Sequence, residues 1–212
     1  MAHRAHELDG GSSTGIRAHM KDNERQGGEM KSEAKTLVAL TIGHSTRTIE
    51  EFVRLLHAHA GTRVVDVRTV PRSRHNPQFN RDTLPDSLKS AGIGYVHMPE
   101  LGGLRRAARD SINMGWQNAS FRGYADYMQT AEFREAIERL IQVMHEDRIA
   151  LMCAEAVPWR CHRSLIADAL LVRGIRSEEI VSPTRTQVHL LTPFAKVDGL
   201  RIFYPPLQTA PE

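Results

Sequence analysis

The sequence predicts a single three-layer α/β domain with a mostly parallel central sheet and helices on both faces. Short apolar runs of strand length alternate with segments whose apolar residues recur at helical spacing, and this alternation is typical of parallel sheets with crossover helices. The 212 residues suffice for one domain with a full hydrophobic core. Hydrophobic residues make up 41% and charged residues 25% of the chain, which is ordinary for a globular protein.

The composition also indicates where the protein is located and which partners it can bind. The two cysteines are too few for a disulfide scaffold, and no apolar run approaches the roughly 20 residues that span a bilayer. The N-terminus lacks the apolar core of a signal peptide. We therefore expect a cytoplasmic protein with reduced thiols and no membrane partner. The net charge of +3 permits anionic ligands, although it does not by itself imply nucleic acid.

Three segments are expected along the chain. Residues 1–34 are polar and rich in glycine and serine, with too few apolar residues to form a core, so we predict disorder there. Residues 35–194 are expected to form the α/β domain. Residues 195–212 are expected to be a C-terminal tail, whose structure the sequence leaves open.

Six apolar runs predict the strands of the sheet. The first four are short, strongly apolar and bounded by polar or glycine-containing loops, as expected of strands that are buried on both faces. The last two are more polar and predict strands more weakly. In chain order, the runs are 36–42, 62–67, 94–98, 149–153, 179–182 and 188–191.

Five segments between these runs predict helices, because their apolar residues recur at three- and four-residue intervals. Thr48 opens a capping box, and Thr130 is the expected N-cap of a longer helix. Asp82 is the expected N-cap of the second helix, which has Pro85 in its first turn. Gly174 is the expected C-cap of the last helix. In chain order, the helices are expected at about 48–59, 82–91, 121–128, 130–144 and 163–172.

Reactive side chains concentrate in the loops that leave the carboxyl ends of the predicted strands. In open α/β sheets, ligands bind outside these ends. The loops at the opposite edge are short and plain, so this asymmetry predicts one site built from several loops. The loops concerned are 44–48, 68–79, 99–119, 154–162 and 183–187.

Several separated motifs lie within this predicted domain, between about Leu37 and Ser182. In chain order they are Thr41–Ser45, Val65–Arg68, Pro71–Arg74, Asn76–Phe79, Leu101–Gly103, Cys153–Glu155 and Cys161–Arg163. This set resembles the motifs of the family called domain of unknown function 488. The resemblance implies a compact α/β fold and the clustering of these residues, and it implies no particular reaction.

Cys161, His162 and Arg163 stand at the predicted N-terminus of the last helix. Free amides and the positive end of the helix dipole attract anions there, and they favour a thiolate. One interpretation is therefore an anion pocket with a reactive thiol. The other is that Cys161 is a small buried hydrophobe beside a solvated helix start. The cysteine-loop-arginine cradle of thiol phosphatases and rhodaneses is similar in outline only, because Trp159 stands where those enzymes need arginine.

A zinc site is an open alternative in the same segment. Cys153, Glu155, Cys161 and His162 carry suitable donor atoms, and His44 or Asp66 could join them from neighbouring strand ends. The close paired spacing of structural zinc sites is missing, so the sequence does not predict a metal centre outright. If a metal binds, the two cysteines and His162 are its expected ligands, and zinc is the expected ion.

The leading hypothesis is a small enzyme that acts on a phosphate-bearing or other anionic substrate, such as a nucleotide or a nucleic-acid component. Glu155 and His44 are the candidate acid–base groups, and Cys161 is the candidate nucleophile. Glu155 has a second interpretation, in which it pairs with an arginine of the loop between Arg68 and Arg74. The expected anion-binding residues are Ser45, Arg68, Arg72, Arg74, His162 and Arg163.

Two other functions stay open from the sequence. The arginine-rich loops at 68–81 and 105–109 could bind backbone phosphate in a non-catalytic nucleic-acid-binding module. A zinc-dependent hydrolase or lyase is the third hypothesis. The sequence does not specify the substrate, the reaction or the oligomeric state.

Overall fold

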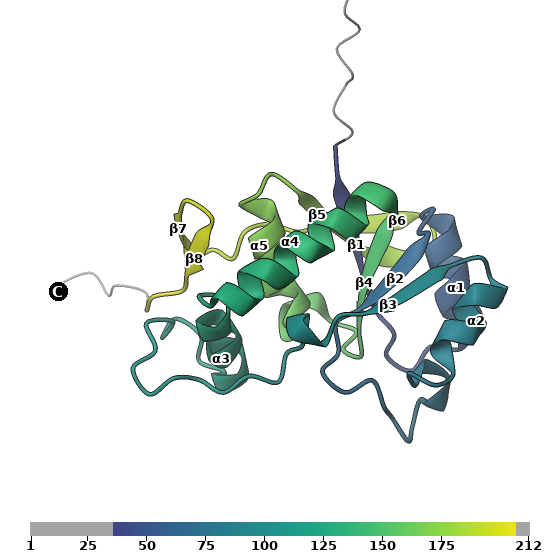
Figure 1. The fold of residues 1–212 in the computed structure, drawn as a ribbon, viewed down its shortest axis with the longest axis horizontal. Coiled ribbons are helices and arrows are strands. Elements are labelled where there is room, and N and C mark those ends of the chain that lie inside the picture. Colours follow the sequence, from purple (N-terminus) through teal and green to yellow (C-terminus); the bar gives the residue numbers. More distant parts are fainter. Residues whose placement is uncertain (1–35, 207–212) are drawn as a thin grey trace, which may run out of the picture. The chain divides into compact units, whose positions relative to one another are not determined.

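The computed structural model describes residues 36–206, so the disorder predicted for residues 1–34 lies outside the described residues. The main sheet has six strands in the order β3-β2-β4-β1-β5-β6 (Figure 1). Its first five strands along the chain run in parallel, and β6 is antiparallel to β5, which confirms the predicted mostly parallel sheet. The strands are β1 (Val38–Gly43), β2 (Arg63–Asp66), β3 (Gly94–His97), β4 (Ile149–Cys153), β5 (Arg176–Ser182) and β6 (Arg185–Val188).

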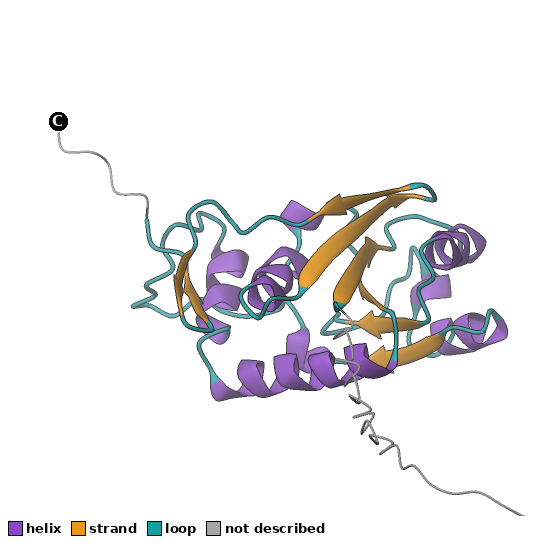
Figure 2. Ribbon diagram, turned by 90° about the horizontal axis from the view of Figure 1, so that it is seen from above, coloured by secondary structure: helices purple, strands orange, loops and turns teal. Residues whose placement is uncertain are grey.

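Helices cover both faces of this sheet, which confirms the predicted three layers (Figure 1 and Figure 2). Strand residues alternate between two apolar clusters, because successive side chains of a strand point to opposite faces. Leu40 and Met152 pack with α1 and α2, whereas Val65 and Leu151 pack with α3, α4 and α5. No helix within residues 36–206 is long and apolar enough to cross a membrane. The helices are α1 (Ile49–Ala58), α2 (Leu84–Ser90), α3 (Ala119–Tyr127), α4 (Ala131–Glu146) and α5 (Arg163–Leu171).

Three of the four predicted helix caps are confirmed. The side chains of Thr48 and Thr130 each accept a first-turn amide, at 3.2 Å in both cases. Gly174 ends the last helix with a φ of +76°, in the left-handed region that glycine adopts without strain. The prediction of Asp82 as a cap is wrong. The chain still forms a turn at that residue, and α2 begins only at Leu84.

The sixth strand lies three residues earlier than predicted. β6 occupies residues 185–188 instead of 188–191, because the chain reverses at positions 183–184 directly after β5. The predicted loop at 183–187 is therefore the tip and the second strand of a β-hairpin.

The segment predicted as a C-terminal tail contributes to the core. It forms a two-stranded hairpin of β7 (Lys196–Asp198) and β8 (Arg201–Phe203), in which Ile202 is buried. Tyr204 is fully buried, and its hydroxyl donates a 2.8 Å hydrogen bond to Asp168 on α5. The described part of this segment is thus tied to the domain through the same helix that begins beside Cys161.

Candidate functional site

The carboxyl ends of β1 and β4 lie side by side at a switch in the sheet. β1 leads to α1 on one face, whereas β4 leads to α5 on the opposite face. Gly43 pairs with Cys153 in the ladder, and the His44 amide donates to the Cys153 carbonyl oxygen at 2.9 Å. A switch of this kind opens a crevice, and it is the usual ligand site of an open α/β sheet.

A cavity of about 320 Å³ lies at this carboxyl edge, and we call it the site cavity. Its walls are the loops that follow β2, β3 and β4, together with the first turn of α3. Polar walls come from Glu155 and Arg160, and apolar walls from Val70, Leu104 and Phe121. Both cysteines and His162 also line it. Three of the five loops predicted to form one site contribute to these walls, namely 68–79, 99–119 and 154–162, whereas the loops at 44–48 and 183–187 do not.

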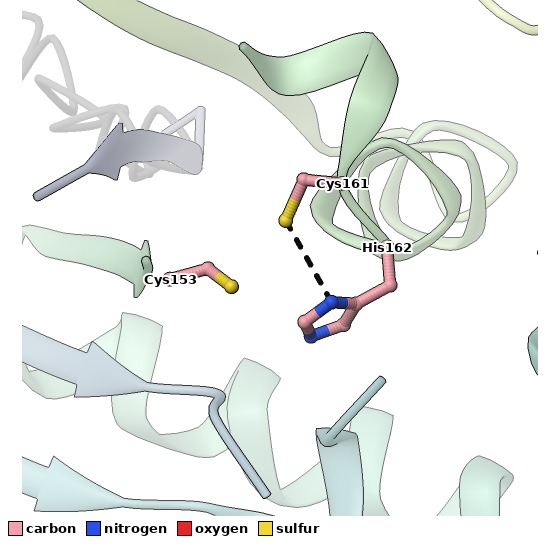
Figure 3. Close-up of side chains that lie close together, drawn as sticks. All are labelled: Cys153, Cys161 and His162. Carbon is pink, nitrogen blue, oxygen red and sulfur yellow. Dashed lines mark hydrogen bonds between the residues drawn. The ribbon is translucent and has the colours of Figure 1, made fainter. Parts of the chain in front are cut away.

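Cys153, Cys161 and His162 lie close together (Figure 3), and all three line the site cavity. Cys153 ends β4, and the other two residues immediately precede α5. The two sulfur atoms and one ring nitrogen of His162 all lie within 4.8 Å of one another. Both thiols are free, and both side chains are largely buried, so the cavity is their route to a small molecule.

The ring of His162 is oriented by the backbone. Its Nε2 lies 3.1 Å from the carbonyl oxygen of Val67, an acceptor only, so Nε2 carries a proton and donates it. The Nδ1 atom of the neutral ring is then a free acceptor, and it faces the Cys161 sulfur at 3.6 Å. This tautomer, assigned from the hydrogen-bond partners, makes His162 a base for Cys161.

The two thiols have opposite acidities. The neighbouring Cys153 thiol, followed by His162 and Arg163, lowers the pKa of Cys161 well below its usual range, although burial opposes this effect. The neighbouring Cys161 sulfur, together with burial, raises the pKa of Cys153. Cys161 is therefore the more acidic thiol of the pair, and the free Nδ1 of His162 is placed to take its proton.

The same three donor atoms fit a metal ion. A tetrahedral zinc ion with a sulfur ligand at about 2.3 Å and a nitrogen ligand at about 2.0 Å separates the two ligands by about 3.5 Å. The observed distance from Cys161 Sγ to His162 Nδ1 is 3.6 Å. The bond from His162 to the Val67 carbonyl is also the usual outer contact of a metal-bound histidine. Two thiolates and one imidazole leave a fourth position for a further ligand.

His44 does not line the site cavity. Its ring stacks on Phe79 at a centroid distance of 4.3 Å and is only 1% exposed. Nδ1 donates to the Ser45 carbonyl oxygen at 2.9 Å, so Nε2 accepts from Arg68 at 3.2 Å. Burial lowers its pKa to about 4, so the ring is neutral near pH 7. The acid–base role predicted for His44 is not supported by this placement, and the residue positions Arg68 instead.

The buried neutral ring of His44 predicts acid sensitivity. In the unfolded chain it takes up a proton below about pH 6.5, whereas in the folded protein it does so only near pH 4. The contribution of the neutral His44 ring to the free energy of unfolding is therefore fully present above pH 6.5, and about 2–3 kcal/mol of it is lost as the pH falls towards 4. Urea unfolding of the wild type and of His44→Gln at pH 7.5 and 4.5 measures this loss of stability. If both proteins lose the same stability between the two pH values, His44 is not the cause.

Arg68 is held by internal partners. Its Nε and Nη2 donate to the two carboxylate oxygens of Asp66 at 2.8 and 2.6 Å, and Nη2 also donates to the Phe79 carbonyl oxygen at 2.7 Å. Tyr95 donates a further hydrogen bond to Asp66, so this carboxylate is well satisfied. Arg68 touches the wall of the site cavity but is only 7% exposed. Its main role in the structure is to fix the loop after β2.

Arg163 is likewise committed to internal partners. It is 1% exposed, and its Nη1 donates to Glu179 Oε2 at 3.1 Å while Nη2 donates to the Glu155 carbonyl oxygen at 2.7 Å. Thr41 donates a second hydrogen bond to Glu179. The carboxylate that pairs with this arginine is thus Glu179 on β5, and Glu155 contributes its backbone. Arg163 and Glu179 also border a second cavity, of about 360 Å³, which contains neither thiol.

The remaining predicted anion-binding residues do not join one cluster. Arg72 and Arg74 are exposed on the loop after β2 and do not line the site cavity. Ser45 has a φ of 48° and donates its amide to the Ala154 carbonyl oxygen at 3.0 Å, so it supports the loop after β4 from outside the cavity. Of the six predicted residues, only His162 and Arg68 face the site cavity.

Glu155 is the predicted acid–base residue that the structure places in the site cavity. Its side chain is half-buried, and one carboxylate oxygen accepts the Val157 amide at 3.1 Å. That bond holds the loop after β4 in a tight turn and leaves the other oxygen available. The carboxylate can therefore accept or donate a proton in the cavity.

Two residues that are not among the predicted catalytic, anion-binding or metal-binding residues complete the site. Arg160 is an exposed cation on its rim, and its side chain has no ion-pair or hydrogen-bond partner among residues 36–206. Gly103 packs against the His162 ring so closely that a Cβ atom would lie 2.5 Å from Nδ1. The sequence carried a signal for Gly103, because the adjacent glycines Gly102 and Gly103 indicate a close approach of other atoms to the backbone.

Comparisons with known proteins identify a family without a described activity. A family model described as Domain of unknown function DUF488 matches residues 48–170. The match includes both cysteines, His162 and most of the loops around the site cavity. Searches of curated proteins and of solved structures found no match.

Proposed function

Because this chain belongs to the family described as Domain of unknown function DUF488, whose description assigns no reaction, we propose its function from its own site. We propose a cysteine-dependent enzyme in which the Cys161 thiolate attacks a small electrophilic substrate in the site cavity. One observation carries this proposal: the free Nδ1 of His162 faces the Cys161 sulfur at 3.6 Å, while Nε2 is fixed on the Val67 carbonyl.

Each part of the site has a role in this proposal. Cys161 is the nucleophile, and His162 accepts its proton and returns it to a leaving group. The N-terminus of α5 adds the positive end of a helix dipole beside the thiolate. Glu155 is the acid–base group for the substrate itself.

The substrate class follows from the walls of the site cavity. A volume of about 320 Å³ suits a small molecule rather than a polymer. Apolar side chains form most of the walls that lie away from the thiols, and Arg160 places one free cation at the rim. We therefore propose a compact, partly apolar substrate with a carboxylate or phosphate group that Arg160 binds. We also place the protein in the cytoplasm, where the thiols it needs stay reduced.

The pH dependence of alkylation tests this proposal. An ordinary cysteine loses about tenfold in alkylation rate for each pH unit below its pKa. Because the pKa of Cys161 is held far below its usual range, its iodoacetamide rate is expected to change little between pH 8 and pH 6. Mass spectrometry of chelator-treated protein identifies the alkylated residue and gives the rate.

The controls for alkylation are the unfolded chain and His162→Gln. In the unfolded chain, the alkylation rate is expected to fall about 100-fold between pH 8 and pH 6. In His162→Gln the rate is expected to fall less than this but more than in the native protein, because the variant keeps the other contacts of the thiolate. If native Cys161 follows the unfolded chain at every pH, the thiolate proposal is wrong.

A zinc-dependent hydrolase or lyase is the second candidate, and the donor geometry favours it. Cys153, Cys161 and His162 would hold the ion, and Glu155 would be the acid–base group beside it. Elemental analysis of protein purified without chelator separates the candidates. About one zinc per chain that survives dialysis supports the hydrolase or lyase, and metal-free protein with a fast thiol supports the cysteine-dependent enzyme.

A further inference from the structure

We infer that Cys153 and Cys161 act together as a dithiol that reduces a small disulfide and becomes a protein disulfide. This inference rests on the proposed nucleophilic role of Cys161 and names the substrate class of the same site. It adds a role for Cys153, the resolving thiol, which the proposed function does not use.

The placement of the two sulfur atoms supports the inference. They approach within 4.8 Å, although one belongs to the end of β4 and the other to the residue before α5. A disulfide bond is about 2 Å long, so each sulfur has to move by no more than about 1.5 Å. Both sulfur atoms also face the site cavity, which is where a small disulfide would enter.

The surroundings give the two thiols different roles. Cys161 has the base His162 beside it and precedes a helix, so it is the sulfur that attacks. Cys153 lies at the end of a buried strand, within 4.8 Å of the Cys161 sulfur. A thiol held against the attacking sulfur is in position to resolve a mixed disulfide.

The reaction balances in two steps. In the first, the Cys161 thiolate attacks one sulfur of the substrate disulfide and forms a mixed disulfide, and the released substrate thiolate takes the Cys161 proton from His162 Nδ1. In the second, Cys153 gives its proton to the now neutral His162 Nδ1 and attacks the Cys161 sulfur, and the second released substrate thiolate takes that proton. The protein is oxidised by two electrons, the substrate is reduced to two thiols, and the two protons come from Cys161 and Cys153.

The walls of the cavity select among small disulfides. Val70, Leu104 and Phe121 favour an apolar or aromatic body, and the free cation of Arg160 favours an acidic group. The aromatic disulfide dithiobis(nitrobenzoate), which carries two carboxylates, has this chemistry, and its released thiolate is coloured. It is therefore the probe of choice.

Stoichiometry with this probe tests the inference. Reduced, chelator-treated wild-type protein is expected to release two equivalents of coloured thiolate per chain and to retain no adduct, because the second release forms the Cys153–Cys161 bond. Cys153→Ser is expected to release one equivalent and to keep one adduct on Cys161. Cys161→Ser is expected to react about 100-fold more slowly, because the thiol that remains holds its proton.

Intact mass and peptide mapping decide between the outcomes. Two stable adducts on the wild type, or one adduct that never resolves, would overturn the dithiol inference. If Cys161 in that same protein is still alkylated rapidly, the proposed role of Cys161 as nucleophile is retained and only the dithiol inference fails. Cys153→Ala repeats the serine experiment without a hydroxyl at this position, and circular dichroism shows that each variant is folded. Thiols that react only after chelation would indicate the zinc candidate and would overturn the inference for the native protein.

Discussion

Replacement of Arg163 by alanine is expected to destabilise the protein by about 3–5 kcal/mol, the usual cost of removing one partner of a buried ion pair. Arg163 is 1% exposed and holds Glu179 on one side and the Glu155 carbonyl oxygen on the other. Without the guanidinium, Glu179 keeps only its hydrogen bond from Thr41 in a buried position. Its burial already favours the protonated form and raises its pKa.

Urea unfolding of Arg163→Ala measures this loss, and a double variant separates charge from packing. Arg163→Met with Glu179→Gln removes both charges and keeps most of the volume. It is expected to recover a large part of the lost stability, because no unpaired charge stays buried. If the single and double variants are equally unstable, the ion pair is not the cause, and the lost bond to the Glu155 carbonyl is the better explanation.

Replacement of Gly43 by alanine is expected to destabilise the protein by about 3 kcal/mol or more, at the upper end of the cost of overpacking. A Cβ atom on Gly43 would lie 2.1 Å from the Glu155 carbonyl oxygen and 2.7 Å from the Ala156 Cα. These are backbone atoms, so no side chain can rotate away. The loop after β4 would have to move, and it would take with it the carbonyl that Arg163 binds.

Gly61→Ala is the matched control for Gly43→Ala. The nearest atoms to a Cβ at Gly61 lie at 3.4 Å or more, so the loss there is expected to stay below about 1 kcal/mol. Denaturant midpoints of the two variants give the comparison. Because the loop after β4 carries Glu155 and leads to Cys161, Gly43→Ala is also expected to slow alkylation of Cys161. An unchanged rate would show that the loop adapts without moving the thiols.

The strands, the helices and the edge that carries the site could be predicted from sequence because each depends on local patterns. Apolar runs indicate buried strands, and the carboxyl-edge rule places the loops together without knowledge of the strand order. The thiols, His162 and Glu155 lie within one strand, loop and helix start, so their proximity follows from adjacent residues. These are the parts of the site that the structure brings together.

Partners that come from distant segments could not be predicted in the same way. Arg163 pairs with Glu179 on β5, which lies next to β1, and the sequence does not show that neighbour relation. His44 is removed from the cavity by Phe79, which lies 35 residues further along the chain. The C-terminal hairpin could not be predicted because its strands have three residues each, which is too short for an apolar pattern. The segment is also held by a distant partner, because the Tyr204 hydroxyl binds Asp168 on α5.

The two nitrogen atoms of His162 connect the sheet to the Cys161 thiol. One is bound to the carbonyl that follows β2, and the other faces the sulfur that precedes α5. Any movement that separates these two elements breaks one contact or the other and withdraws the base from Cys161. The alkylation rate of a single cysteine therefore reports, in solution and without an added label, how often the β2 end of the sheet and the start of α5 come apart.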